Sequence, residues 1–140
     1  MAHRVYGKDF REDIRLDKFA LDSEAEMNPN MLHDHGMALA DAKAQRDHAD
    51  HQVDMIVAAT ELDIRGKDPK SFGVDKYTEA IVKALVEVDP AVIKAKQTLL
   101  AAKEDTYLRE ASVNALNDKS SMIKVLQNLF TTGYYGSGPQ

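Results

Sequence analysis

The chain has 140 residues, no cysteine and a formal net charge of −5. This length corresponds to one ordinary domain that can bury a core without cross-links. The lack of cysteine excludes disulfides, thiolate catalysis and thiolate-ligated zinc. The acidic total argues against a general nucleic-acid coat, which usually carries a surplus of basic side chains.

The N-terminal sequence MAHRVYGKDFRED lacks the apolar segment of a signal peptide, and no apolar run approaches the length that spans a membrane. The absence of cysteine fits a reducing compartment. These features predict a soluble, cytoplasmic protein.

Charge is distributed unevenly along the chain. Residues 1–64 carry seven basic and fourteen acidic side chains, residues 65–76 carry four and two, and residues 77–140 carry seven of each. The stretch RGKDPKSFGVDK, residues 65–76, is therefore net positive within an acidic protein. A local phosphate-binding patch is compatible with the acidic total, particularly if oligomerisation repeats that patch.

Residues 1–28 are expected to form an N-terminal arm. Its beginning has little hydrophobic pattern, and Phe10 and Ile14 then have the spacing of a short helix. Asn28-Pro29 predicts a break, because proline lacks a donor and disfavours the helical conformation of the residue before it. We therefore place the start of the first long helix at Pro29.

The first long helix is expected over residues 29–65. A basic loop follows over residues 66–75, where Gly66, Pro69 and Gly73 are turn residues. Within the helix, residues at alternating spacings of 3 and 4 form one narrow stripe, which we call the seam. Most of them are small or apolar, and two are basic. The seam residues are Leu32, His35, Leu39, Ala42, Arg46, Ala49, Val53 and Ile56.

A short helix is expected over residues 76–88 and a second long helix over residues 89–132. Asp89-Pro90 predicts the start of the latter, because proline is well tolerated in a first helical turn. A flexible tail, residues 133–140, begins at a glycine suited to a C-cap. The seam of the second long helix includes Val92, Ala95, Leu99, Ala102, Val113, Leu116, Ile123 and Leu126.

These elements predict an all-α fold in which the two long helices form an antiparallel, coiled-coil-like hairpin. Each helix would extend ~50–60 Å at ~1.5 Å per residue, which is too long for a compact bundle of this size. The seams are rich in alanine and contain Arg46 and Arg109. Because a lone hairpin of this kind buries little apolar area, we expect a homo-oligomer.

Apolar and aromatic residues at the C-terminal end are the candidates for contacts between subunits. Tyr134 and Tyr135 stand outside the predicted helix, so they either fold back on their own core or dock on a neighbouring subunit. The candidate oligomerisation residues are Leu126, Leu129, Phe130, Tyr134 and Tyr135.

RDHADHQVD, residues 46–54, is the most metal-like stretch, since Asp47, Asp50, His51 and Asp54 fall on one side of a helix. Di-metal helical bundles need a matching carboxylate–histidine pair on the facing helix, and the second long helix contains no histidine. A solvated acidic face is therefore the favoured interpretation, and we expect neither a metal nor a cofactor.

Enzyme motifs are also missing from the sequence. It contains no Glu-x-x-Glu pair of the kind that holds magnesium in small helical pyrophosphatases, and its isolated glycines do not make a phosphate-cradling loop. No serine, histidine and aspartate occur in a recognisable triad context. We therefore expect that the protein is not an enzyme.

The basic segment admits two interpretations. It is either a solvated connector between helices or a site where lysines reach phosphates while Phe72 or Tyr77 stacks on a base. Four basic residues in one copy give few contacts, whereas a ring of copies gives an avid and salt-dependent surface.

Residues 74–103, VDKYTEAIVKALVEVDPAVIKAKQTLLAAK, resemble the phage recombination mediators of the UvsY family. The similarity extends upstream to IRLDKFALDSEAEMNPNML and downstream to LQNLFTTGYY, so that it covers most of the chain. It runs without a gap through Asp75, Lys76, Tyr77, Lys83, Asp89, Val92 and Lys94.

The resemblance implies an all-helical protein that assembles into rings of six or seven subunits and has no catalytic activity. Members of this family bind single-stranded DNA and help to load a RecA-type recombinase in place of the single-strand-binding protein. In a phage, this implies work in the cytoplasm of the bacterial host.

The chain departs from the family at the end of the first long helix. Ala58, Ala59 and Glu61 stand where the family carries basic residues, and the basic residues here lie further on, from Arg65 and Lys67. Either the DNA follows the shifted cluster, or the protein mainly retains its partner role.

The resulting hypothesis is a recombination mediator that binds single-stranded DNA. The alternative is a structural coiled-coil adaptor, such as a virion assembly or scaffolding protein, with the same seams but no affinity for DNA. The candidate DNA-binding residues are Arg65, Lys67, Lys70, Lys76 and Lys83.

Overall fold

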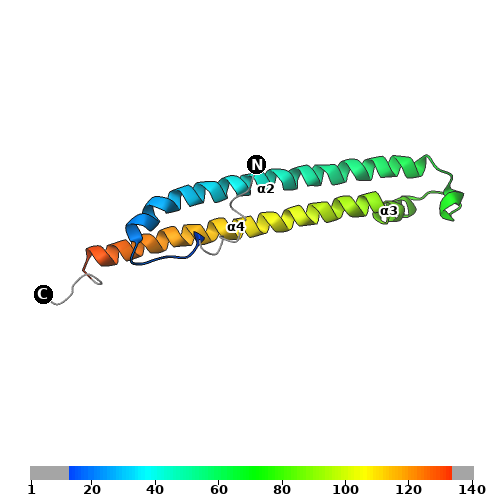
Figure 1. The fold of residues 1–140 in the computed structure, drawn as a ribbon. Helices are drawn as coiled ribbons and strands as arrows, with labels where there is room; N and C mark the ends of the chain where they lie inside the picture. The colour runs from blue at the N-terminus through cyan, green and yellow to red at the C-terminus, as the bar shows by residue number, and fades with distance from the viewer. Residues whose placement is uncertain (1–12, 134–140) are drawn as a thin grey trace. The chain divides into compact units, whose positions relative to one another are not determined.

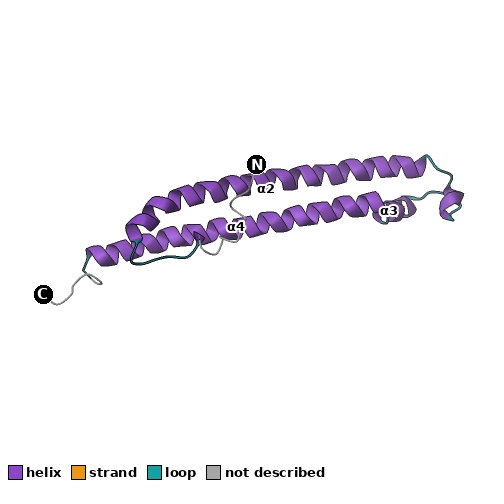
Figure 2. Cartoon of the chain, viewed as in Figure 1, coloured by secondary structure: helices purple, strands orange, loops and turns teal. Residues whose placement is uncertain are grey.

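The computed structural model describes residues 13–133, and this part of the chain contains helices and turns but no strand (Figures 1 and 2). The prediction of an all-α fold is therefore confirmed. The elements in order are α2 (Leu21–Arg65), the 3-10 helix η2 (Pro69–Phe72), α3 (Glu79–Glu87) and α4 (Pro90–Thr131). None of these helices is both long enough and apolar enough to cross a membrane.

The chain divides into two compact units. Unit 1 combines Met1–Asp41 with Tyr107–Gln140, and unit 2 is Ala42–Thr106. The long helices α2 and α4 contribute to both units. Within each unit, segments of these two helices run side by side in opposite directions (Figure 1), as the hairpin prediction requires.

Helix α2 begins at Leu21, so the prediction of a break at Asn28-Pro29 was wrong. Leu21 and Asn28 are buried, and the Asn28 Nδ2 donates to Ser120 Oγ on α4. Packing against α4 therefore keeps this segment helical, while Pro29 lies exposed and removes a single backbone donor. Figure 1 shows α2 curved over this blue, N-terminal part.

The short helix predicted around Phe10 and Ile14 falls mostly outside the described residues. Asp13 is helical, and residues 14–20 form turns and irregular backbone. The Asp17 carboxylate accepts a hydrogen bond from Phe19 N at 2.9 Å, and the Asp17 carbonyl accepts one from Ala20 N at 3.2 Å. These local bonds offer the backbone an alternative to a helix. We refer to residues 13–20 as the strap.

Unit 2 contains an aliphatic cluster beside the turn that joins its helices. Ile64 of α2, Val82 and Val86 of α3 and Val92 of α4 are all buried there. Val82 and Val86 share one face of α3 at a spacing of four, which is why this short helix can pack against both long ones. The packing of this cluster holds α2, α3 and α4 together beside the turn.

Hydroxyl and carboxylate caps set the boundaries of the helices in unit 2. Thr78 Oγ1 accepts from Ile81 N at 3.2 Å, so α3 starts at Glu79, three residues later than predicted. Asp89 Oδ1 accepts from Ala91 N at 2.9 Å, which confirms the predicted start of α4 at Asp89-Pro90.

Candidate nucleic-acid interface at the turn of unit 2

The turn between α2 and α3 is ordered by local hydrogen bonds. The Asp68 carboxylate caps η2 by accepting from Lys70 N at 3.0 Å. Gly73 ends η2 with a φ of 76°, which side chains with a Cβ rarely adopt. The sequence predicted this segment as a plain loop, and η2 arises from Asp68-Pro69, a capping residue followed by a proline suited to a first turn.

An aromatic pair lies within the same turn. The Phe72 and Tyr77 ring centroids are 6.5 Å apart with an interplanar angle of 54°. The Tyr77 hydroxyl donates to the Lys67 carbonyl at 2.7 Å, which holds the tyrosine against the backbone at the end of α2. Phe72 is 36% exposed and is therefore available to a ligand.

Arg65, the last residue of α2, is held by two carboxylates. Its Nη2 lies 2.8 Å from Glu79 Oε1 on α3 and 3.1 Å from Glu61 Oε1 one turn earlier on α2. Hydrogen bonds to Glu79 and then to Glu61 raise the pKa of the Arg65 guanidinium above its usual value. Arg65 thus connects α2 to α3, and much of its hydrogen-bonding capacity is used within the chain.

Lys67 has a partner of the same kind. Its Nζ lies 3.0 Å from Asp63 Oδ2, four residues earlier in the chain. Both residues are more than half exposed, so this ion pair is weak and a phosphate can compete for the lysine. Lys67 is therefore less strongly held than Arg65.

The other three candidate residues are exposed lysines without an ion-pair partner in the described part of the chain. Lys70 lies on η2, Lys76 lies between η2 and α3, and Lys83 lies on α3. The structure therefore separates the five candidate residues into two held by neighbouring acids and three whose charges face solvent.

The metal-like stretch of α2 forms no site in the described residues. Asp47, Asp50, His51 and Asp54 are exposed on α2, and Arg46 Nη2 lies 3.1 Å from Asp47 Oδ1. Across residues 13–133, no group of three histidine or carboxylate side chains is placed to hold a metal ion.

The predicted oligomerisation residues lie at the C-terminal end of α4. Leu126 and Leu129 are half-buried, and Phe130 is 36% exposed. Tyr134 and Tyr135 fall outside the described residues. The apolar side chains at the C-terminal end of α4 are therefore partly exposed to solvent.

Unit 2 carries a second open apolar surface, which was not predicted from the sequence. A groove of about 760 Å³ runs between α2 and α4. Small side chains form most of it, which is the structural consequence of the alanine-rich seams. Its lining includes Ala44, Ala49, Ile56, Ala91, Ala95 and Ala102.

Unit 1 contains a buried polar network that was not predicted from the sequence. Lys119 Nζ lies 2.6 Å from Glu24 Oε2 and donates to the Asp13 carbonyl at 2.7 Å, while His35 Nε2 lies 3.0 Å from Asp13 Oδ2. The Lys119 and His35 side chains are each only 3% exposed. The sequence contained one signal of this burial. The predicted seam has no member between Leu116 and Ile123, and Lys119 lies three residues after the first and four before the second, on the face that packs.

No protein-family model matches this chain, and neither a curated protein nor a solved structure matches it.

Proposed function

We propose that the chain is a non-enzymatic recombination mediator that binds single-stranded DNA at the turn of unit 2. The proposal rests on Lys70, Lys76 and Lys83, whose exposed charges have no acidic partner within residues 13–133. Lys70 and Lys76 are neighbours in sequence of the Phe72–Tyr77 pair. The resemblance of residues 74–103 to UvsY-family mediators adds support, since this segment contains two of the three lysines.

The proposed binding is electrostatic and independent of base sequence. Lysine ammonium groups contact phosphates as point charges, and an exposed aromatic ring stacks on any unpaired base. Phe72 supplies that ring. Tyr77 packs beside it and is itself held by the hydrogen bond from its hydroxyl to the Lys67 carbonyl. Arg65 maintains the connection between α2 and α3 and contributes less to phosphate contacts, because Glu61 and Glu79 already hold it.

The mediator role also requires assembly. Three lysines in one copy bind a strand weakly, whereas several linked copies raise the effective concentration of each turn next to the strand. The exposed apolar side chains of α4 and the alanine-lined groove of unit 2 are the surfaces available for a homo-oligomer. The assembled turns would hold the strand for a RecA-type recombinase while weakening the grip of a single-strand-binding protein.

A structural coiled-coil adaptor is the second candidate function. It is favoured by the open apolar groove together with exposed Leu62 and Leu100 in the same unit, which are 74% and 57% exposed. Such surfaces mark interaction sites. An adaptor needs these surfaces and no affinity for DNA, so DNA binding distinguishes the two functions.

The test compares two double charge reversals that change the net charge equally. Lys70→Glu/Lys76→Glu alters the turn, and Lys103→Glu/Lys124→Glu alters exposed lysines on α4. Binding of a fluorescent single-stranded oligonucleotide should fall strongly in the first variant and little in the second, with the mass in solution unchanged in both. Equal losses would mean that the net charge controls binding, and unaltered binding of the turn variant would refute the site.

A further inference from the structure

Unit 1 presents an exposed stripe of apolar side chains along α4. Its members follow one another at alternating spacings of three and four residues, which is the pattern of a face that packs against another helix. Leu108 is 69% exposed, and Met122 and Val125 are each about half exposed. We call this surface the outer stripe. It consists of Leu108, Ala111, Ala115, Met122 and Val125, with Asp118 between the third and the fourth.

The outer stripe is distinct from the buried seam of the same helix. The buried residues Ser112, Leu116 and Ile123 each follow a member of the outer stripe by one residue. One residue corresponds to a rotation of about 100° around a helix. The outer stripe therefore lies beside the seam and stays on the surface while the seam is packed. Exposed apolar surface of this kind marks interaction sites.

Asp118 is the one charged member of the outer stripe, and it is exposed without an ion-pair partner within residues 13–133. A carboxylate that is covered by an apolar contact needs a partner. Two copies of the outer stripe do not supply one to each other. In a parallel alignment Asp118 faces Asp118, and in an antiparallel alignment of the whole stripe it faces Ala115. The outer stripe therefore fits a surface that carries a basic group.

The alanine-lined groove of unit 2 carries such a group. Lys94 is the only lysine, arginine or carboxylate among the residues that line the groove, all of which the structure describes. Its side chain is exposed and has no ion-pair partner within residues 13–133. From Ala91 to Ala102 the groove extends about 17 Å along α4. Small lining residues leave room for the larger side chains of an incoming helix, which is a common mode of helix recognition.

The spacing of the side chains fits the groove in one direction. Met122 and Val125 follow Asp118 by four and seven residues, or about 6 and 10 Å along a helix. Ala102 follows Lys94 by eight residues, or about 12 Å. With Asp118 beside Lys94 and the two helices parallel, Met122 and Val125 therefore lie over the longer, alanine-lined part of the groove.

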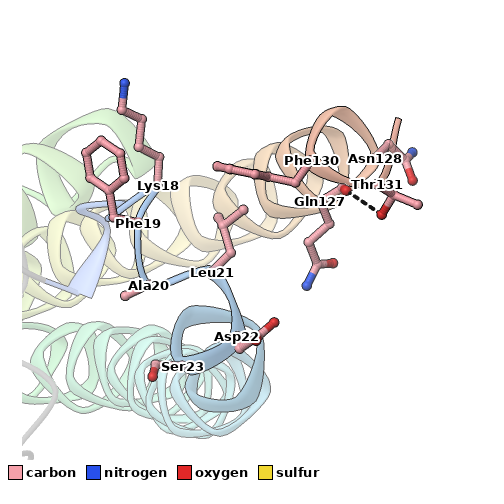
Figure 3. A pocket seen from close by; sticks show the side chains of 10 residues that line it. All are labelled: Lys18, Phe19, Ala20, Leu21, Asp22, Ser23, Gln127, Asn128, Phe130 and Thr131. Carbon is pink, nitrogen blue, oxygen red and sulfur yellow. Dashed lines mark hydrogen bonds between the residues drawn. The ribbon is translucent and has the colours of Figure 1, made fainter. Parts of the chain in front are cut away.

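A hollow of about 920 Å³ in unit 1, next to the strap, is less suitable for the outer stripe (Figure 3). Its polar residues include Asp22, Ser23, Gln127 and Asn128. Apolar side chains would take these groups out of water without replacing their hydrogen bonds. Asp22 would also repel Asp118. Charge and polarity thus favour the groove of unit 2.

We propose that copies of the chain associate head to tail, with the outer stripe of one copy in the groove of the next copy and Asp118 paired with Lys94. The two surfaces are different, so a copy that offers its stripe to one neighbour still offers its groove to another. This inference rests on the assembly that the proposed function requires, and it names the two surfaces that join.

The first test exchanges the two charges and measures the mass in solution by light scattering. Asp118→Lys and Lys94→Glu should each lower the mass toward that of a single copy, because each puts like charges into the contact. The double variant Asp118→Lys/Lys94→Glu should restore the wild-type mass, since it re-forms the pair with reversed signs. The matched controls Glu26→Lys and Lys103→Glu reverse exposed charges outside the two surfaces and should leave the mass unchanged. All four positions are exposed, so the helical circular dichroism signal should be preserved.

The second test mixes two variants that each lack one surface. Met122→Glu places a charge in the outer stripe, and Ala102→Glu places one in the groove. Each variant alone should be a single copy, and an equimolar mixture should form a complex of two copies, because one intact stripe then meets one intact groove.

Three results would overturn the proposal. They are a wild-type mass that corresponds to a single copy at every concentration, a mass unaffected by the single charge reversals, and a double exchange that fails to restore the mass. The oligonucleotide test of the turn reads DNA binding instead of mass, so a failure of the DNA site is recognised separately from a failure of this interface.

Discussion

The two units of this protein are held together by different chemistry. In unit 1, the interior includes the polar residues Asn28, His35 and Lys119, each of which is buried. In unit 2, Ile64 and three valines form an aliphatic cluster beside the turn. Polar contacts depend strongly on geometry, whereas aliphatic packing mainly requires volume. Unit 1 is therefore expected to tolerate substitution less well than unit 2.

The polar interior also fixes which residues face each other in unit 1. Asp13 accepts from Lys119 and contacts His35, so it ties the strap to both long helices. Asn28 bonds to Ser120 at another level of the same helix pair. A shift of one helix along the other would leave several of these groups buried and unbonded, which is a cost that an alanine seam alone would not impose.

The largest effect is expected from Lys119→Met, which keeps most of the side-chain volume and removes the charge. Glu24 and the Asp13 carbonyl would lose their buried donor, and breaking a buried ion pair costs about 3 kcal/mol or more in unfolding free energy. Lys124→Met, on an exposed position of the same helix, is the control. Urea unfolding followed by circular dichroism measures both, and a Lys119 effect as small as that of Lys124 would remove the contrast between the units.

A smaller effect is expected from Val92→Ala in unit 2. Val92 is fully buried in the aliphatic cluster, and the loss of its methyl groups should cost about 2 kcal/mol. Val88→Ala changes the same residue type at a 66% exposed position and should change stability by less than about 0.5 kcal/mol. Equal effects of the two substitutions would mean that the cluster does not stabilise the turn.

The smallest effect is expected from Arg65→Ala, because the Arg65 ion pairs are at the surface and are screened by salt. The melting temperature should fall slightly at low ionic strength and less at high ionic strength. Oligonucleotide affinity should change less than in Lys70→Ala, since Glu61 and Glu79 already hold Arg65. A larger loss of affinity for the Arg65 variant would make this arginine a principal DNA contact.

The sequence predicted the elements whose signals are local. Asp89-Pro90 at the start of α4 and Gly133 after its end act through neighbouring backbone groups, so their roles follow from sequence position. The start of α2 at Leu21 could not be predicted from local sequence. A hydrogen bond from Asn28 to Ser120, which is distant in the chain, outweighs the local effect of Pro29.

The sequence predicted which basic residues lie at the candidate site, but it did not predict which of them are paired with acidic residues. Basic residues at the turn were evident, but the pairing of Arg65 with Glu79 depends on how α3 packs against α2. The role of Lys119 could not be assigned, because a lysine between two seam positions is usually solvated. Its burial requires an acid at residue 24 and a carbonyl at residue 13, which only the folded chain brings together.

The most direct test of the proposed function is the titration of the unmodified protein with a fluorescent single-stranded oligonucleotide at low and near-physiological salt. Binding should weaken steeply with salt. The logarithm of the binding constant should fall against the logarithm of the salt concentration with a slope of about −2 for each copy that contacts the strand through three lysines. Absence of binding at low salt would contradict the account, and the structural adaptor would then be the better description of the protein.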